Sequence, residues 1–494
     1  MPMALLEFAY LLCTLLLSVY GFNSLLLVAL YLQHRRDASP DPAPGEAWPS
    51  VTVQLPIYNE VHTVERLVQA AASMDYPRDL LEIQVLDDST DQTRVLASRV
   101  VARLREQGSN VVHVTRPTRE GFKAGALAVG TARAKGELLA IFDADFLPQP
   151  DFLHRVVPHF RDPTVGCVQA RWGHLNRQYS LLTEAQALGV DGHFLVEQTA
   201  RSRAGLFINF NGTAGIWRRT CIQDAGGWRA DTLTEDLDLS YRAQLRGWRI
   251  HYLPDVVVPA ELPAQVGAFK RQQARWAQGS IQTAMRLIGP LVRSDQPWAV
   301  KLEGIIHLTG YLVHPLMLAM VLLTVPLNVR QSWVLATTPW LVVAAVGPPL
   351  LYAVAEVSTG RQWIKHLRAL PLLVLLGTGI ALSNARAVLN AILGRQHAFQ
   401  RTPKFALRDM GDRWVHSRYA LDLDALVWGE LGMAAFALAV VIVSRVDQGT
   451  VPWMLLYAAG FAYVAVVSLV QAVERQRWLA RRPKSGARRR EGTR

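Results

Sequence analysis

Long apolar segments constrain the fold of this chain more than any other feature. Residues 8–32 contain no Asp, Glu, Lys or Arg, and a helix of roughly 20 apolar residues is long enough to cross a bilayer. Similar segments follow at 304–325, 333–355, 425–443 and 451–473, the fourth of which contains Glu430. We therefore expect an integral, multi-pass membrane protein.

Basic residues predict how these segments are oriented. No Lys or Arg precedes the first segment, whereas Arg35 and Arg36 follow it, so the N-terminus should lie outside and the following chain in the cytosol. The segment is too long for a signal peptide and is not followed by a small-residue cleavage site. The net charge of +12 is concentrated beside the apolar segments and in the tail 474–494, which favours lipid headgroups over nucleic acid as its partner.

Between the first two apolar segments the sequence predicts a soluble α/β domain. A Pro-, Ala- and Asp-rich linker spans 37–49, and the domain should occupy 50–263. Helical stretches at 61–73 and 92–105 separate apolar runs, which predicts parallel strands covered on both faces; the runs are 51–55, 80–86, 111–114 and 138–142. In such sheets, ligands bind beyond the carboxyl ends of the strands.

The remaining segments are expected to be membrane helices and their connections. Residues 264–300 are amphipathic and should lie at the membrane interface. Two transmembrane hairpins are expected at 301–356 and 425–473. Between them, polar residues interrupt 357–394, which we expect to be in-plane or re-entrant, so that the basic loop 395–420 stays cytosolic.

Acidic residues follow two of the predicted strands. Asp143 and Asp145 come directly after 138–142, and together they could bind Mg²⁺ or Mn²⁺ while leaving sites for two phosphate oxygens. Asp88 ends the second strand, where it could accept hydrogen bonds from a nucleotide ribose or base. The alternatives are solvated loop aspartates and, for Asp88, a cap on the next helix, for which Asp91 is the better candidate.

Other side chains near strand ends could complete a nucleotide site. Pro56, Tyr58 and Glu60 follow the first strand and could line a base pocket. Lys123 lies near a helix start among glycines, where a phosphate can approach the backbone closely. An ordinary exposed lysine is the alternative.

A second acidic cluster opens the helix predicted at 237–245. Glu235 and Asp236 lie at its start, where a carboxylate could take a proton from an acceptor hydroxyl. Helix capping is the alternative. Gly212 and Thr213 belong to a Gly-rich loop that either lets backbone approach a substrate or simply makes a turn.

The most specific motif is Gln272, Arg275 and Trp276, which share one helix face because they are spaced at i, i+3 and i+4. Arg can clamp a diphosphate, and an indole offers a flat face to a sugar ring. The alternative is a basic aromatic helix at the membrane surface.

In this order the motifs resemble the processive enzymes of glycosyltransferase family 2, such as the cellulose, hyaluronan and chitin synthases. The family's spaced aspartates and Gln-x-x-Arg-Trp motif are matched by Asp88, Asp143, Asp145, Asp236 and residues 272–276. Six strings look closer still to the plant cellulose synthase-like A and C branches, which make mannan or glucomannan and the glucan backbone of xyloglucan. They lie at 85–91, 122–127, 141–146, 168–172, 210–218 and 272–276.

The resemblance implies a GT-A domain, an α/β fold with a Rossmann-like mixed sheet, joined to an α-helical transmembrane region. It implies one in-line displacement with inversion, and it assigns roles to the motif residues. Asp236 would be the base, beside Glu235. Asp143 and Asp145 would bind the metal and diphosphate, and Asp88 the nucleoside. Gln272 and Arg275 would hold the diphosphate, and Trp276 would stack on the acceptor, near Gly212 and Thr213.

Residues 399–404 resemble the loop that closes over the nucleotide in cellulose synthase. Thr402 and Lys404 match that loop and are expected to contact the donor. Arg401 stands where Val is usual, which is the one clear departure from the family pattern.

These observations predict a membrane enzyme that polymerises a nucleotide-sugar into a β-linked polysaccharide and guides it outward. UDP-glucose is the first expected donor and GDP-mannose the second. A transferase that adds one sugar to a lipid is the main alternative, and a channel or transporter is a third. The Arg- and Ala-rich composition favours a bacterial plasma membrane.

Overall fold

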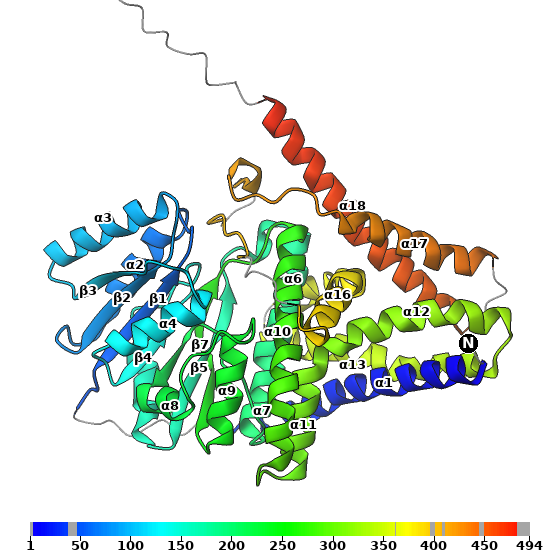
Figure 1. Ribbon diagram of the computed structural model, residues 1–494, viewed down its shortest axis with the longest axis horizontal. Coiled ribbons are helices and arrows are strands. Elements are labelled where there is room, and N and C mark those ends of the chain that lie inside the picture. The colour runs from blue at the N-terminus through cyan, green and yellow to red at the C-terminus, as the bar shows by residue number, and fades with distance from the viewer. Residues whose placement is uncertain are drawn as a thin grey trace, which may run out of the picture.

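The computed structural model describes residues 3–37, 47–360, 362–395, 401–407, 411–443 and 449–481. A sheet with its covering helices occupies one end of the molecule and apolar helices the other, and α10 (Val266–Arg293) runs between them (Figure 1).

The sheet has seven strands in the described part of the chain, in the order β3-β2-β1-β4-β6-β5-β7. β1 pairs in parallel with β2 and β4, and β2 with β3. β6 is antiparallel to both of its neighbours, β4 and β5, whereas β5 is parallel to β7. The expected GT-A-like mixed sheet is confirmed. The strands are β1 (Val51–Ile57), β2 (Leu81–Asp87), β3 (Val111–Thr115), β4 (Leu138–Ile141), β5 (Val165–His174), β6 (Gly215–Arg218) and β7 (Arg249–Ala260).

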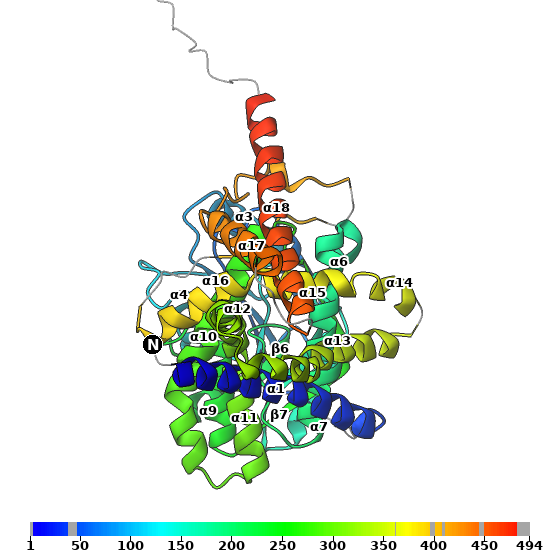
Figure 2. The ribbon, with the colours of Figure 1, turned by 90° about the vertical axis from the view of Figure 1, so that its right-hand side faces the viewer.

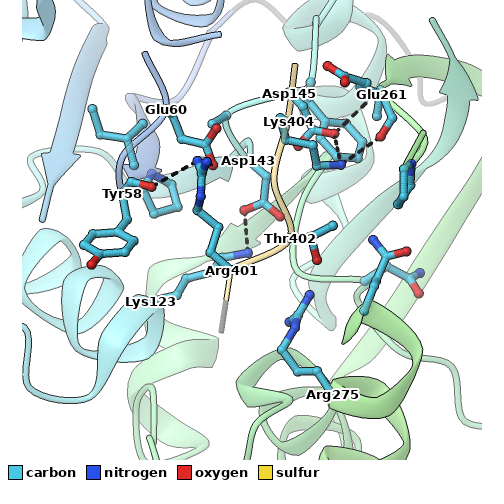
Figure 3. A pocket seen from close by; sticks show the side chains of 18 of the residues that line it. Tyr58, Glu60, Lys123, Asp143, Asp145, Glu261, Arg275, Arg401, Thr402 and Lys404 are labelled. Carbon is cyan, nitrogen blue, oxygen red and sulfur yellow. Dashed lines mark hydrogen bonds and ion pairs between the residues drawn. The ribbon is translucent and has the colours of Figure 1, made fainter. Parts of the chain in front are cut away.

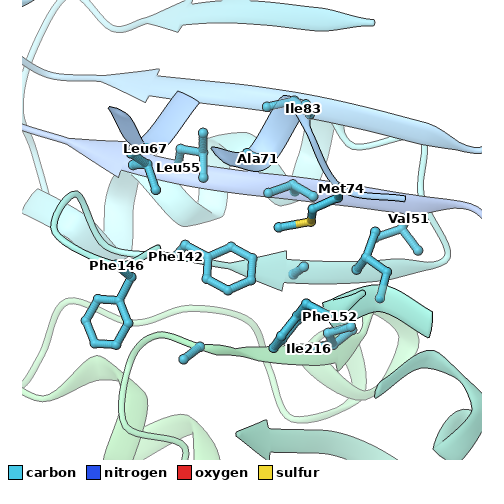
Figure 4. Packing of buried hydrophobic residues seen from close by; sticks show 14 of the residues in the cluster. Val51, Leu55, Leu67, Ala71, Met74, Ile83, Phe142, Phe146, Phe152 and Ile216 are labelled. Atoms are coloured by element: carbon cyan, nitrogen blue, oxygen red, sulfur yellow. The ribbon is translucent and has the colours of Figure 1, made fainter. Parts of the chain in front are cut away.

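Both faces of the sheet are covered by helices, and alternate residues of a strand point to opposite faces. Each strand therefore contributes side chains to two cores. In β4, Leu138 and Ala140 join the core that contains α2 and α3, whereas Leu139 and Ile141 join the core beneath α4, α8 and α9. Figure 4 shows part of the first core, in which Phe142 and Phe152 pack edge to face. The helices of this domain are α2 (Val64–Ala72), α3 (Thr93–Glu106), α4 (Phe122–Arg133), α5 (Phe152–Val156), α6 (Leu181–Asp191), α7 (Thr199–Arg203), α8 (Arg219–Asp224) and α9 (Glu235–Leu245), with a π-helical segment over Gly192–Gln198.

Among the described residues, three helical segments are long and apolar enough to cross a membrane, namely Met3–His34, Trp298–Val329 and Val451–Arg481. A fourth candidate is the pair Trp363–Gly379 and Ala381–Ile392, which is bent by 42°. The division into membrane and cytosolic segments stays a prediction. The helices of this region are α1 (Met3–His34), α11 (Trp298–Thr309), α12 (Val313–Val329), α13 (Leu341–Ser358), α14 (Trp363–Leu367), α15 (Leu370–Gly379), α16 (Ala381–Ile392), α17 (Leu426–Val443) and α18 (Val451–Arg481).

Small residues and buried ion pairs join these helices. A Cβ on Gly347 of α13 would lie 2.2 Å from the carbonyl oxygen of Gly21 in α1, a close approach typical of membrane helix pairs. Glu430, which interrupts the apolar segment 425–443, is fully buried in α17, and its carboxylate lies 2.5 Å from Nζ of Lys270 in α10. Since burying a lone charge is costly, this pair explains how α17 tolerates a glutamate.

Candidate active site

One cleft lies beyond the carboxyl ends of β1, β2 and β4 and encloses about 1230 Å³, including space open to solvent. Its walls come from the strand ends, α9, α10 and the segment 401–404. Every site residue expected from the sequence lines it except Gly212 and Thr213, which lie behind its wall. The expected residues in the lining are Pro56, Tyr58, Glu60, Asp88, Lys123, Asp143, Asp145, Glu235, Asp236, Gln272, Arg275, Trp276, Thr402 and Lys404.

Lys123 joins two of the acidic motifs. It lies in the first turn of α4, and its Nζ is 2.6 Å from Asp143 Oδ1 and 3.8 Å from Glu235 Oε1. Nζ also donates to the carbonyl oxygen of Gly212 at 2.8 Å. Burial lowers the pKa of Lys123, but the two carboxylates outweigh it and leave the pKa raised. Lys123 is therefore a fixed cation between the β4 end and α9.

Asp145 lies deeper, where it meets the segment 401–407 (Figure 3). Nζ of Lys404 lies 2.7 Å from Asp145 Oδ2 and donates to the carbonyl oxygen of Glu261 at 2.8 Å. The Glu261 carboxylate accepts the backbone N–H groups of Phe405 and Ala406 at 2.8 and 2.7 Å. The end of β7 thus holds this segment against the cleft, a role for Glu261 that no sequence motif indicated.

Arg401, the departure from the family pattern, has partners of its own. Its guanidinium lies 2.7 Å from Glu60 Oε1 and 3.3 Å from the Tyr58 carbonyl oxygen (Figure 3). It also lies over the Tyr419 ring, 4.4 Å from the ring centre. Burial raises the pKa of Glu60 to about 7, although Arg401 lowers it. Arg401 therefore ties the segment to the end of β1. Phe399 and Gln400 of the expected loop lie outside the described residues.

Two arginines near the end of β2 were not expected from the sequence, and Arg119 of these lines the cleft. Arg116 grips the Asp88 carboxylate with two nitrogens, with Nε at 2.9 Å from Oδ1. The Arg119 guanidinium lies 3.3 Å from the centre of the Tyr58 ring. Asp88 is not the cap of α3, because Asp91 accepts the N–H of Thr93 at 2.8 Å instead. Arg116 therefore holds the Asp88 carboxylate at the cleft, and Asp88 does not cap α3.

Asp236 lies in the first turn of α9, against the loop of Gly212. Burial and the neighbouring Glu235 raise the pKa of Asp236 to about 7, and Lys123 and Arg275 oppose this shift. Gly212 has φ +79°, and a Cβ there would lie 2.7 Å from Asp236 Oδ2. Only glycine therefore leaves room for this carboxylate.

Thr213 differs from its expected role as an acceptor contact. It is fully buried, and its hydroxyl accepts the backbone N–H of Asp143 at 2.9 Å. In this arrangement it cannot touch a substrate, so it positions Asp143 instead. The sequence could not distinguish contact with an acceptor from positioning of Asp143, because a threonine in a Gly-rich loop suits both roles.

On α10, Gln272, Arg275 and Trp276 all face the cleft, as the helical spacing predicts. Trp276 is accompanied by Trp172 of β5, whose ring centre lies 6.5 Å away. Trp172 also packs against Phe146 at 5.1 Å. Aromatic side chains thus form part of the cleft lining, and Trp172, which lies in the string 168–172, is one to which the sequence assigned no role of its own.

The acidic residues fit a divalent cation that takes its remaining ligands from a substrate. In the described part of the chain, no three His, Cys, Asp or Glu residues are arranged to hold a metal. Asp143 and Asp145 each use one carboxylate oxygen in an ion pair, with Lys123 and Lys404. Two carboxylates suit Mg²⁺ or Mn²⁺, which are commonly bound by one or two carboxylates plus phosphates.

A comparison with protein families finds a match in this domain. Residues 49–279 match the family described as glycosyltransferase like family 2. This part of the chain is therefore similar to family 2 glycosyltransferases. The domain includes every expected site residue except Thr402 and Lys404, which come from the segment after it.

Curated relatives are plant proteins. The chain is 47% identical over 237 residues to probable glucomannan 4-beta-mannosyltransferase 7 of Oryza sativa subsp. japonica, covering 47% of this chain and 40% of the relative. It is 43% identical over 254 residues to glucomannan 4-beta-mannosyltransferase 2 of Arabidopsis thaliana, covering 50% and 48%. The match spans about half the length of these relatives or less. The cellulose synthase-like A resemblance is confirmed, whereas the expected bacterial source has no support.

Among solved structures, a mannosyltransferase from Pyrobaculum calidifontis in complex with GDP-Man and Mn²⁺ has a similar fold. Its TM-score is 0.51 at 24% identity, over 79% of this chain and all of that one. At this identity the likeness concerns the fold alone.

Proposed function

We propose that this chain is a membrane-embedded inverting transferase that moves mannose from GDP-mannose to a growing β-linked polysaccharide, with UDP-glucose as the second candidate donor. The order of donors is reversed from the sequence expectation because the relatives are named as glucomannan mannosyltransferases. The observation that carries the proposal is one cleft that is lined by the buried carboxylate of Asp236, by Asp143 and Asp145, and by the aromatic rings of Trp172 and Trp276.

The proposed reaction is one displacement at the anomeric carbon. Asp236 takes the proton of an acceptor hydroxyl, whose oxygen bonds to C1 of the donor sugar as the bond from C1 to the diphosphate oxygen breaks. The electron pair of that bond leaves with the nucleoside diphosphate, so an α-linked donor gives a β-linked product. A pKa of about 7 suits Asp236 for this work, because a base is most effective when its pKa is near the working pH.

Cationic side chains meet the charge that develops on the leaving group. Arg275 faces the cleft from α10, and Lys123 is held beside Asp143. Asp143 and Asp145 would hold a Mg²⁺ or Mn²⁺ ion, which supplies positive charge at the diphosphate. Fixed charges in a site that excludes water stabilise a transition state strongly, because they need no reorganisation during the reaction.

The acceptor is proposed to lie against Trp276 and Trp172, whose rings offer apolar faces to a sugar. The membrane helices beside α10 support a polymer that is passed onward rather than released as a soluble sugar. Transfer of one sugar to a membrane lipid is the competing outcome.

A donor screen tests the proposal. Purified protein is incubated with GDP-mannose or UDP-glucose and Mn²⁺ or Mg²⁺, and the released nucleotide is measured. We expect GDP release that EDTA or Asp145→Ala abolishes, together with an insoluble product sensitive to β-mannanase. UDP release with a glucanase-sensitive product would change the donor, and a labelled product extracted by organic solvent would favour the glycolipid alternative. No release from either donor would contradict the proposed function.

A further inference from the structure

His174 lines the cleft at the end of β5, yet the proposed reaction leaves it without a role. Its side chain is only 8% exposed, and its Nε2 lies 2.9 Å from Asp191 Oδ1 in α6. A carboxylate can only accept, so Nε2 must carry a proton. Nδ1 has no hydrogen-bond partner among the described residues, so it is the ring nitrogen that remains available to a ligand.

The Asp191 carboxylate that binds this ring also forms an ion pair with Arg177. Its second oxygen lies 2.8 Å from Nη1 of Arg177, whose Nη2 lies 2.6 Å from Glu356 Oε1. His366 Nδ1 lies 2.9 Å from the other oxygen of Glu356. Burial raises the pKa of Asp191, but His174 and Arg177 outweigh it and lower that pKa. Asp191 is thus an ionised anchor for the imidazole.

This chain of groups runs from the cleft to α13 and α14, which lie beside α6 (Figure 2). Glu356 is fully buried and Asp191 nearly so. Buried ion pairs contribute little net stability, because desolvation offsets their attraction. The Asp191 carboxylate instead fixes the orientation and the tautomer of His174, as carboxylates do for histidines in functional sites.

We propose that His174 binds a sugar hydroxyl in the cleft through Nδ1, with Asp191, Arg177 and Glu356 as positioning residues. The inference rests on the proposed function. Its ligand is a hexose hydroxyl, which belongs either to the donor sugar or to the terminal acceptor sugar. An imidazole Nδ1 that lacks a proton accepts a hydrogen bond from such a hydroxyl.

Three variants separate the two ring nitrogens. His174→Gln keeps an amide where Nε2 meets Asp191 but loses the polar atom at Nδ1. His174→Asn keeps a polar atom near Nδ1 and loses the contact with Asp191. His174→Phe keeps a ring and loses both. A lost neutral hydrogen bond should raise KM roughly three- to tenfold, so Gln and Phe should raise KM and Asn should restore much of the affinity.

Two assays distinguish the sources of the hydroxyl. Hydrolysis of GDP-mannose without acceptor gives the KM for the donor, and transfer to a manno-oligosaccharide gives the KM for the acceptor. A rise in the first assigns the hydroxyl to the donor sugar, and a rise in the second alone assigns it to the acceptor. The Kd for GDP, which has no sugar beyond its ribose, should stay unchanged and reports that the cleft is folded.

His113→Gln is the matched control, because His113 Nε2 also lies 2.9 Å from a carboxylate, that of Asp87, outside the cleft lining. Its KM values should equal those of the unmodified protein. Unchanged KM values in His174→Gln, or Asn raising KM more than Gln does, would overturn the inference. If His174→Gln does not bind GDP, the KM values of His174→Phe and His174→Asn are compared instead, and a KM for Phe no higher than that for Asn would overturn the inference. Absence of transfer by the unmodified protein would instead contradict the proposed function.

Discussion

Basic side chains of the chain pair with several of the carboxylates that line the cleft. Lys123 faces Asp143, Lys404 faces Asp145, and Arg401 pairs with Glu60 at 2.7 Å. Because a buried carboxylate without a partner is costly, these pairs offset the negative charge that the strand ends bring together. A ligand that reaches Asp143 or Asp145 would therefore have to displace a lysine side chain.

Asp236→Asn tests the base at the residue scale. Asparagine keeps the shape of the side chain but cannot take a proton, so we expect transfer to fall by roughly 10²–10⁴. Binding of GDP, measured by calorimetry, should stay within a few-fold. Transfer close to that of the unmodified protein would remove Asp236 from the base role.

Glu235→Gln tests the electrostatics of the same base. Asp236 must be ionised to act, so activity should fall as the pH drops through its pKa of about 7. Glu235 raises that pKa, so its neutralisation should move the acidic limb of the pH–rate profile to lower pH. The profile of initial rates measures this directly, and a limb that stays in place or moves upward would contradict the account.

At the scale of elements, the loop before β6 shapes the site through one glycine. Gly212→Ala places a Cβ at 2.7 Å from Asp236 Oδ2 on a residue with φ +79°. We expect strong loss of transfer, with unfolding easier by about 1 kcal/mol from the backbone conformation alone. The measurements are initial rate and thermal unfolding in detergent.

Gly227→Ala is the control for that substitution, since Gly227 has φ +73° but nothing lies within 4 Å of an added Cβ. Gly227→Ala should lose about as much stability as Gly212→Ala from the backbone conformation, but it should keep its activity. Equal loss of activity in both variants would mean that the steric contact with Asp236 is unimportant.

The elements that the sequence predicted well are those with continuous apolar runs. The runs at 51–55 and 111–114 became β1 and β3, because both faces of these strands are covered by helices. No bounds are predicted for β5, β6 and β7, and in β5 the apolar pattern is interrupted by Gln169, which is fully buried. Gln169 is tolerated because its amide donates to backbone carbonyl oxygens, including that of Thr213 at 3.1 Å, a pairing that only the folded sheet provides.

Some site residues could be predicted from the sequence and others could not. Asp88, Asp143 and Asp236 lie at the ends of predicted strands and helices and follow the motif order of glycosyltransferase family 2, so they were expected in one cleft. Arg116 and Glu261 could not be found, because each acts through a partner distant in the chain. Glu261, for instance, accepts the N–H groups of 405 and 406.

At the scale of the whole molecule, the segment 401–407 bears on the membrane topology. It contacts Glu60 and Asp145, so it lies on the same side as the catalytic domain. If Trp298–Val329 crosses once, a second crossing is needed to return the chain to that side, and either the bent pair Trp363–Gly379 and Ala381–Ile392 or the shorter apolar helix within α13 would supply it. The re-entrant arrangement of 357–394 stays a prediction.

The Lys270–Glu430 pair joins the catalytic domain to the membrane region, since α10 supplies one partner and α17 the other. Lys270→Met leaves Glu430 buried without its partner, which should destabilise the protein by about 3–5 kcal/mol. The double variant Lys270→Met with Glu430→Leu should recover most of that loss. Thermal unfolding in detergent tests this, and a double variant as unstable as the single one would contradict it.

The central claim is that one cleft makes β-linked polymer from an α-linked nucleotide-sugar. The most direct measurement is the configuration of the product made from GDP-mannose and Mn²⁺, read from the anomeric NMR signals and from digestion by a β-mannanase. The account predicts β-linked mannose polymer, absent with Asp236→Asn. An α-linked product, or one that resists the β-specific enzyme, would contradict it.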